Sequence, residues 1–390
     1  MAAVAAISFS TALTSVFCAL MLVSWISSGQ AWSTLLESSR QPIGVALAVF
    51  LGVVALGMLQ GPVEIGNRFE VLWGWRKLFY TVVLLGLFAD QRWKHYFVLS
   101  FLTVACIGFG LSYVSWVEWV SVDRWREPGI VFQNHSTQGM VFALATLCCH
   151  QLMPKVSRRL QFYLLLFGVL FALNVIFISS GRSGYLALAV VGAIIGISSF
   201  GFRRLPVLAI AAAVAVVVAM TISPILKERV VLAIHEVSNF DPAQGLTSMG
   251  FRLVTYENSA ELIAKRPVLG YGTGSFGKVY SAHVAGKYSD WRADGTTDPH
   301  NQYLFIWIEN GAVGILAFLA FLVLAFLTRG VPSAYSTIGL GALAIWILTS
   351  MFNSHFRTFP EGHLVGLFVG AMLAGGRFMR SPDVSHPVKP

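Results

Sequence analysis

Three basic side chains in this chain have the types and positions that chemistry on a phosphate-linked substrate requires: Arg182, Arg252 and His300. Small residues flank Arg182 within the segment 179–185, where they leave room for a bulky anion and supply backbone donors. Arg252 lies near the start of a predicted helix, and an arginine there opposes the helix dipole unless an anion binds at that end. Histidine is the commonest general base, because its pKa lies near neutrality. Together these side chains suit the transfer of a group from a phosphate-activated donor to an alcohol.

Each of the three residues also has a purely structural interpretation. An arginine at a membrane boundary is often a snorkelling anchor, an arginine on a loop helix is often a solvated surface residue, and a lone histidine is usually a satisfied structural group. For Arg182 the functional interpretation is favoured, because no acidic residue adjoins it in the sequence. An unpaired charge this close to the hydrocarbon indicates a functional site.

Four further polar residues are predicted to support the site. Asp298 is placed to orient His300, and Asn301 adds a hydrogen-bonding group beside it. Arg266 belongs to the Lys-Arg-Pro stretch that ends the predicted loop helix. Asn134 opens another apolar stretch from the same side, where it either lines the cavity or serves as a structural polar group.

A metal site is the competing interpretation, because Asp290, Asp294, Asp298 and His300 lie close together in the sequence. Their spacing matches no recognised ligand motif, and Lys287 dilutes the negative charge of the group. We therefore expect no metal and no cofactor.

The Gly-rich segment 270–277 has the composition of a phosphate cradle. Such a cradle follows a strand, and in a P-loop it ends in Gly-Lys followed by Ser or Thr; neither feature is present. We therefore interpret this segment as a tight structural turn.

The elements that must position these residues are membrane helices. The chain has 390 residues, of which 56% are hydrophobic and 12% charged, with a mean hydropathy of +0.70. Soluble domains contain about 25% charged residues, so the composition predicts an all-α polytopic membrane protein. The apolar runs are continuous, whereas strands of a membrane barrel alternate. The net charge of +9 is scattered over short loops between spans, which argues against nucleic-acid binding.

Apolar stretches near the length that a bilayer requires predict about 11–12 transmembrane helices. The stretch that begins at residue 302 is long enough to contain a break near Glu309-Asn310-Gly311. A twelfth span or a re-entrant piece is suspected from the topology. The eleven stretches are 7–28, 43–60, 76–89, 97–117, 134–153, 160–179, 184–201, 205–222, 302–328, 334–353 and 361–377.

Basic residues in the short loops predict the orientation. They cluster near residues 92–95, 155–159 and 203–204 on one side, which the positive-inside rule assigns to the cytoplasm. The long polar loop 223–300 then lies on the periplasmic side. The predicted organisation is 1–222 for the first helices, 223–300 for the loop with an amphipathic helix and the site, 301–378 for the C-terminal helices, and 379–390 for a disordered cytoplasmic tail.

The order and spacing of these segments resemble the O-antigen ligase superfamily, which also contains O-antigen polymerases and protein O-oligosaccharyltransferases. The resemblance covers about residues 160–325 and includes the array of spans and four segments. These segments are Ser180-Gly181-Arg182 after a span, Arg252 in a loop helix, Pro267 to Gly272, and His300 to Leu304 at the end of the loop.

The resemblance implies a metal-independent, inverting glycosyltransferase of GT-C-like architecture in the bacterial inner membrane. It would take a glycan from undecaprenyl diphosphate on the periplasmic side and join it to a sugar hydroxyl of lipid A–core. His300 matches the histidine proposed as general base in this family, and Arg182 and Arg252 match the arginines thought to hold the diphosphate. Bidentate guanidinium groups suit a diphosphate leaving group, and they would do the work that a metal does elsewhere.

Other functions remain open at this point. A polymerase of the same superfamily would use a similar donor, and a protein O-oligosaccharyltransferase would differ in its acceptor. A membrane transporter belongs to another class, and it would require ionisable groups or broken helices near the bilayer midplane. Here the charges gather at the predicted outer surface, which favours a ligase.

Overall fold

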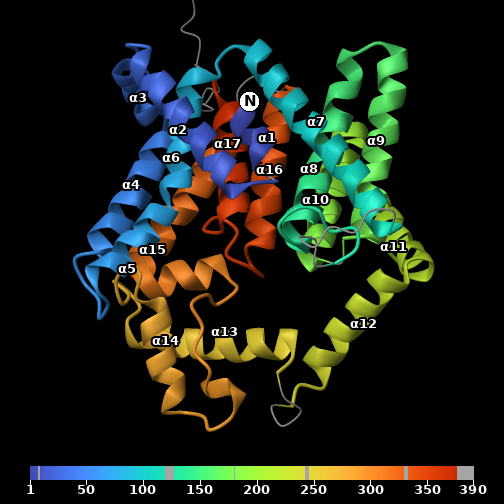
Figure 1. Cartoon of the computed structure of the whole chain (residues 1–390). Coiled ribbons are helices and arrows are strands. Elements are labelled where there is room, and N and C mark those ends of the chain that lie inside the picture. The colour runs from blue at the N-terminus through green and yellow to red at the C-terminus, as the bar shows by residue number, and fades with distance from the viewer. Residues whose placement is uncertain (8, 119–126, 180, 242–245, 329–332, 376–390) are drawn as a thin grey trace, which may run out of the picture.

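The computed structural model describes residues 1–7, 9–118, 127–179, 181–241, 246–328 and 333–375. Within these ranges the chain is built from helices and contains no β-strand, so the predicted all-α fold of a multi-pass membrane protein is confirmed. In Figure 1 most helices pack side by side, while α12, α13 and α14 lie together at one end of the molecule, at the bottom of the view. The polar loop of the sequence therefore forms a separate helical layer.

The helices fall into three groups along the chain. The first group is α1 (Ala2–Ala6), α2 (Thr11–Ser27), α3 (Ala31–Arg40), α4 (Pro42–Gly57), α5 (Ile65–Gly74), α6 (Arg76–Leu87) and α7 (Gln91–Trp116). The second group is α8 (His135–Leu152), η1 (Met153–Lys155), α9 (Arg158–Phe177), α10 (Arg182–Phe200), η2 (Phe202–Arg204) and α11 (Leu205–Ile222). The loop layer is α12 (Pro224–Ser238), α13 (Ser248–Lys265), α14 (Phe276–Ala285) and η4 (Trp291–Ala293); α15 (Gln302–Leu327), α16 (Ala334–Thr349) and α17 (Phe359–Leu373) follow.

Each of the eleven predicted apolar stretches falls on one helix, and some of these helices have the length and hydropathy of a membrane span while others are shorter. Among the described residues, four helices are long and apolar enough to cross a membrane: α7, α9, α10 and α15. The number rises to six if each of two bent helix pairs counts as one span. The helices α4, α16 and α17 are also apolar but shorter, with 10–17 residues. A straight span through the hydrocarbon takes about 20 residues.

The centre of the molecule is formed by α8 and α17. The residues of α17 from Pro360 to Leu373 are all buried, and α8 packs against α9, α10 and α16. Close contact between α8 and α10 occurs at Gly139 and Gly184, where an added Cβ on either glycine would meet the backbone of the other. Small residues at a crossing let two helix backbones approach closely. This crossing sets the start of α10 against the start of α8.

The long helix α15 is interrupted, as the sequence predicted. Gly311 has φ 64° and ψ −164° inside the helix. The segment before α14 docks onto this break: the backbone N–H groups of Tyr271 and Gly272 donate to the carbonyl oxygens of Ile308 and Glu309, at 2.9 and 2.8 Å. These donors are therefore already engaged within the protein. The interpretation of 270–277 as a structural turn is confirmed, and the turn ties the loop layer to α15.

Gly272 provides a test of this docking. Its φ is +99°, and an added Cβ would lie against the carbonyl group of Gln60. We expect Gly272→Ala to lower the free energy of unfolding by about 1–3 kcal/mol, the usual range for a side chain forced into a strained backbone conformation. Thermal unfolding of the purified protein in detergent measures the change.

Gly277→Ala is the matched control for this prediction. Gly277 is a helical residue of α14, and its added Cβ would make an ordinary 3.4 Å contact with the Thr297 side chain. Equal melting temperatures for the two variants would argue against the docking role of Gly272.

Candidate active site

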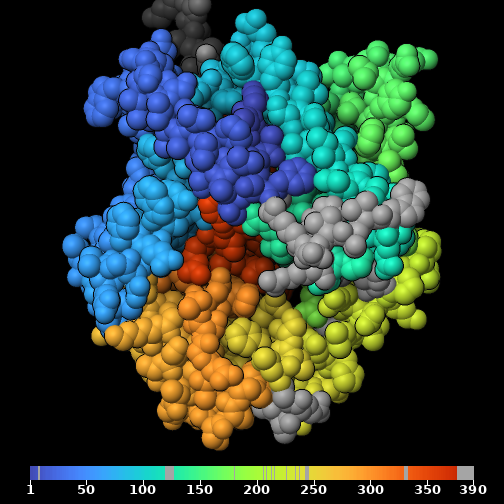
Figure 2. Space-filling view, in the orientation of Figure 1, coloured from blue at the N-terminus to red at the C-terminus, as the bar shows by residue number. Residues whose placement is uncertain are grey.

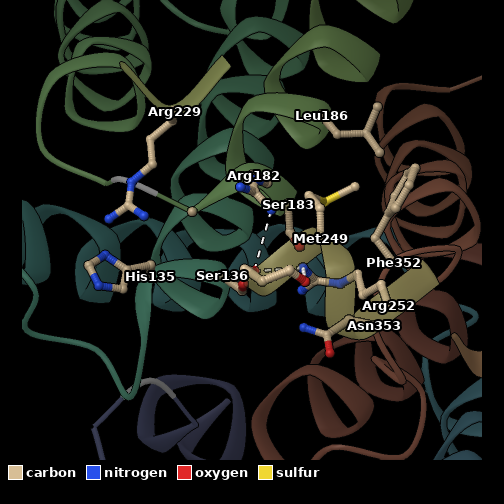
Figure 3. A pocket seen from close by; sticks show the side chains of 12 residues that line it. His135, Ser136, Arg182, Ser183, Leu186, Arg229, Met249, Arg252, Phe352 and Asn353 are labelled. Carbon is tan, nitrogen blue, oxygen red and sulfur yellow. Dashed lines mark hydrogen bonds between the residues drawn. The ribbon is translucent and has the colours of Figure 1, made fainter. Parts of the chain in front are cut away.

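A pocket of about 440 Å³ lies where the loop layer meets the ends of the apolar helices. Its wall comes from the starts of α8 and α10, from α12 and α13, and from the segment after α16 (Figure 3). The lining residues are His135, Ser136, Gly181, Arg182, Ser183, Leu186, Arg229, Ser248, Met249, Arg252, Phe352 and Asn353. Figure 2 shows that one face of the molecule is hollowed between the N-terminal helices and the loop layer, with C-terminal residues at the bottom of the hollow.

Arg182 and Arg252 converge on this pocket from different helices. Arg182 is the first residue of α10, and Nη1 of its side chain lies 3.4 Å from Oγ of Ser248. Nη1 of Arg252 donates to the same Oγ at 3.0 Å and to the backbone oxygen of Ser248 at 3.1 Å. Two residues that are far apart in the sequence thus place their guanidinium groups around one hydroxyl, at the N-terminus of α13. An anion bound there would meet both guanidinium groups and the positive end of the helix dipole.

Arg252 also has a side-chain donor that makes no hydrogen bond within the described residues. Its Nε is buried and has no hydrogen-bond partner among the described residues. Burial lowers the pKa of the Arg252 guanidinium, and the positive charge of Arg182 lowers it further. The Tyr256 phenol acts in the opposite direction and raises the pKa. A buried donor without a partner costs free energy, and a bound anion would relieve both this cost and the repulsion between the two arginines.

The expectation that Arg182 is unpaired is wrong. Oε2 of Glu236, on α12, lies 3.6 Å from Nη2 of Arg182 and accepts a 3.0 Å hydrogen bond from the backbone N–H of Met249. The Glu236 side chain is only 10% exposed. A carboxylate therefore already neutralises part of the positive charge of the pocket, which the sequence around Arg182 did not indicate.

His300 lies next to the pocket with a strained backbone. Its φ is 52°, in the left-handed region that residues other than glycine rarely adopt. Nδ1 of its ring lies 3.0 Å from Oδ1 of Asn353, which lines the pocket. An amide oxygen only accepts, so Nδ1 donates this hydrogen bond, and in the neutral ring the lone pair is then on Nε2. The ring also packs edge-on against Phe251, with centroids 5.8 Å apart. This tautomer is the one a general base at Nε2 requires.

Asp298 and Tyr256 hold the backbone of His300 in this conformation. Oδ1 of Asp298 accepts from the His300 backbone N–H at 2.8 Å and from Oγ of Ser354 at 2.7 Å. The Tyr256 hydroxyl lies 3.0 Å from the His300 carbonyl oxygen and donates to it, and burial raises the pKa of this phenol, which keeps it protonated. The expected role of Asp298 is therefore corrected: it orients the main chain, while Asn353 orients the imidazole.

The remaining predicted site residues are mostly structural. Asn301 caps α15 by accepting from the backbone N–H groups of the first turn, and Asn134 caps α8 by accepting from Thr137 N–H at 2.8 Å. Asn134 acts indirectly, since it fixes the helix start at which two lining residues lie. Arg266 is exposed and stacks on the Tyr271 ring at 5.0 Å. It follows the far end of α13, roughly 20 Å of helix away from the pocket, so the structure does not bring it together with Arg182 and Arg252.

Two of the three acidic residues considered as metal ligands are engaged in other contacts. Asp290 binds the side chain of Arg292 at 2.7 Å, and Oδ2 of Asp298 lies 3.6 Å from the guanidinium group of Arg357. In the part of the chain that the structure describes, no group of three or more His, Cys, Asp or Glu side chains is arranged to hold a metal ion.

Three pocket residues, Arg229, Met249 and Asn353, and the adjoining Glu236 were not identified from the sequence. All four lie in segments with no motif around them, and only their approach to residues from other helices reveals them. Beneath the pocket, the buried ring of His355 lies 3.3 Å from Oγ of Ser183, and burial lowers the pKa of His355. Its ring contacts the lining residue Ser183 and does not itself line the pocket.

The fold and the site together define a multi-pass membrane protein with an arginine-lined pocket between its helices and a helical loop layer. Residues 167–319 match the family described as O-Antigen ligase, and this match supports membership of the O-antigen ligase/polymerase superfamily. Members of this superfamily are glycosyltransferase-like enzymes that act on lipid-linked glycans and lipid acceptors. The matched region contains Arg182, Arg252 and His300. No curated protein matches the chain.

Proposed function

We propose that this protein is an O-antigen ligase of the bacterial inner membrane. It transfers a glycan from undecaprenyl diphosphate to a sugar hydroxyl of lipid A–core at the periplasmic face, in lipopolysaccharide biosynthesis. The observation that supports this most is the convergence of Arg182 and Arg252 on Ser248, in the pocket whose Asn353 holds the ring of His300. This arrangement combines a binding site for a diphosphate with an adjacent base.

In this proposal each residue has a defined role in one displacement reaction. Arg182 and Arg252 bind the diphosphate, and Nε2 of His300 takes the proton from the acceptor hydroxyl. The acceptor oxygen attacks the anomeric carbon from the face opposite the diphosphate, so the configuration inverts. The bond between that carbon and the phosphate oxygen breaks, and its electron pair leaves with the diphosphate. The guanidinium groups stabilise the charge that develops there.

The pocket has an apolar side that suits the lipid part of the donor. In Figure 3, Leu186 and Phe352 lie across the pocket from His135 and Arg229. We propose that the first prenyl units rest on this apolar side while the diphosphate occupies the arginine side. The donor would then bind with its glycan toward His300.

A reconstituted transfer assay tests the proposal. Purified protein receives an undecaprenyl-diphosphate-linked glycan and lipid A–core, with a chelator present throughout. We expect glycosylated lipid A–core at the same rate with and without chelator, because the arginines supply the positive charge that a metal supplies in other transferases. Lengthening of the donor glycan without modification of lipid A–core would instead identify a polymerase. Inhibition by chelator that added divalent ions reverse would revive a metal site at the Asp290 and Asp298 region.

A further inference from the structure

Arg182 and Arg252 do not supply enough net positive charge to neutralise a bound diphosphate. Glu236 cancels one of the two positive charges of Arg182 and Arg252, since its carboxylate lies 3.6 Å from Arg182 and is nearly buried. Nε2 of His135 lies 2.9 Å from the carboxylate of Glu127, which would offset a positive charge on this ring. One net positive charge then faces a donor whose diphosphate carries two negative charges.

The imbalance increases during the proposed reaction. When the bond between the anomeric carbon and the phosphate oxygen breaks, the electron pair stays on that oxygen, and the leaving diphosphate gains a third negative charge. The proton of the acceptor goes to His300, so it does not offset the new charge on the diphosphate. A further cation near the phosphate would therefore stabilise the leaving group more than it stabilises the bound donor.

Arg229 is placed to supply this cation. It lines the same pocket as Arg182 and Arg252, and Figure 3 shows its guanidinium group on the side of His135. Like Arg252, and unlike Arg182, it has no carboxylate within ion-pair distance among the described residues. Arg229 is exposed, so its guanidinium group is accessible to an anion that enters the pocket.

The position of Arg229 follows from how α12 is anchored. Oγ of Ser223 caps the helix by accepting from Leu226 N–H, and it donates to the carbonyl oxygen of Ile176 at 3.0 Å. Leu226 is buried on the first turn, 8% exposed. Residues 229 and 236 are seven positions apart, which places them on the same face of a helix. The face of α12 that brings Glu236 to Arg182 therefore also brings Arg229 to the pocket.

We propose that Arg229 is a third diphosphate-binding residue, which acts mainly on the leaving diphosphate. The inference rests on the proposed function, because it assumes a diphosphate in this pocket. The two arginines identified from the sequence lie on α10 and α13. The inference adds a diphosphate-binding residue on α12.

Binding of inorganic pyrophosphate to the purified full-length protein tests the inference, by titration calorimetry at low ionic strength. We expect Arg229→Gln to raise the Kd about tenfold, in the range of one lost charge-assisted hydrogen bond. We expect Arg229→Lys to stay within a few-fold of the wild type, since an exposed site requires charge more than a fixed fork. In the transfer assay, Arg229→Gln should lower kcat more than it raises the KM for the donor.

Two reference variants separate the outcomes. Lys227→Gln removes a positive charge from the same helix at a residue outside the pocket lining, and it should leave the Kd unchanged. Arg252→Gln reports on the donor site itself. If Arg252→Gln weakens pyrophosphate binding and Arg229→Gln does not, the role of Arg229 is refuted and the proposed function stands. If neither variant changes the Kd, or the wild type does not bind pyrophosphate, the diphosphate site itself is refuted, and the role of Arg229 with it.

Discussion

Replacement of His300 by asparagine is expected to reduce glycan transfer by about 10²–10⁴-fold, the usual contribution of a general base, and to leave the protein folded. Asparagine is the suitable substitute because it tolerates the left-handed conformation that the backbone adopts here, with φ 52°. It keeps a polar side chain but cannot take a proton from the acceptor hydroxyl. Alanine would remove the base as well, and it would add backbone strain that confuses the result.

The transfer assay and a melting curve measure these two effects separately. His300→Asn should keep the melting temperature of the wild type, because the hydrogen bonds of its backbone to Asp298 and Tyr256 do not depend on the ring. His300→Gly also accepts a positive φ, and added imidazole should restore part of its activity by replacing the missing base. Transfer at the wild-type rate by His300→Asn would overturn the assignment of the base.

Replacement of Arg252 by alanine is expected to lower kcat/KM about 10²–10³-fold, as for loss of one donor to a developing oxyanion. Lysine at this position should recover only part of the loss. The donors of the Arg252 guanidinium group have separate positions: Nη1 binds Ser248, while Nε is buried and has no partner among the described residues. A lysine has a single ammonium group and cannot hold Ser248 and a phosphate oxygen in the same way. For Arg182 we also expect wild type to be the most active, lysine to be intermediate and alanine to be the least active. Lysine there would also lose the ion pair between Nη2 and Glu236.

Arg266→Ala provides the matched control for Arg252→Ala. Arg266 follows the end of the same helix, is exposed and stacks on Tyr271, away from the pocket. Its replacement should leave transfer unchanged, so a general effect of charge on the loop layer can be separated from binding. Full activity with lysine at both positions 182 and 252 would argue against bidentate binding of the diphosphate.

Much of the helical architecture is predictable from the sequence, because an apolar run long enough to form a membrane helix is a local property. Each of the eleven apolar stretches coincides with a helix. The break in α15 follows from Gly311, whose φ of 64° suits glycine, and the end of α13 follows from the proline after Arg266. The number of spans is less predictable, because hydropathy shows that a segment avoids water and does not distinguish lipid from a protein interior. The short helix α17, which is almost wholly buried in the protein, is an example.

The sequence alone indicated Arg182, Arg252 and His300 as candidate site residues, from residue type and from position relative to a helix start. Their partners were decided only by the tertiary structure. His300 is oriented by Asn353, 53 positions further along the chain, and Arg182 shares Ser248 with Arg252 from 66 positions away. Arg266 looked equivalent to the other arginines and lies outside the pocket, while Arg229 and Glu236 carried no motif and line or adjoin it. The physical reason is that a side chain's partners depend on which helices pack together, and helix packing depends on contacts such as Gly139 against Gly184 that no single segment encodes.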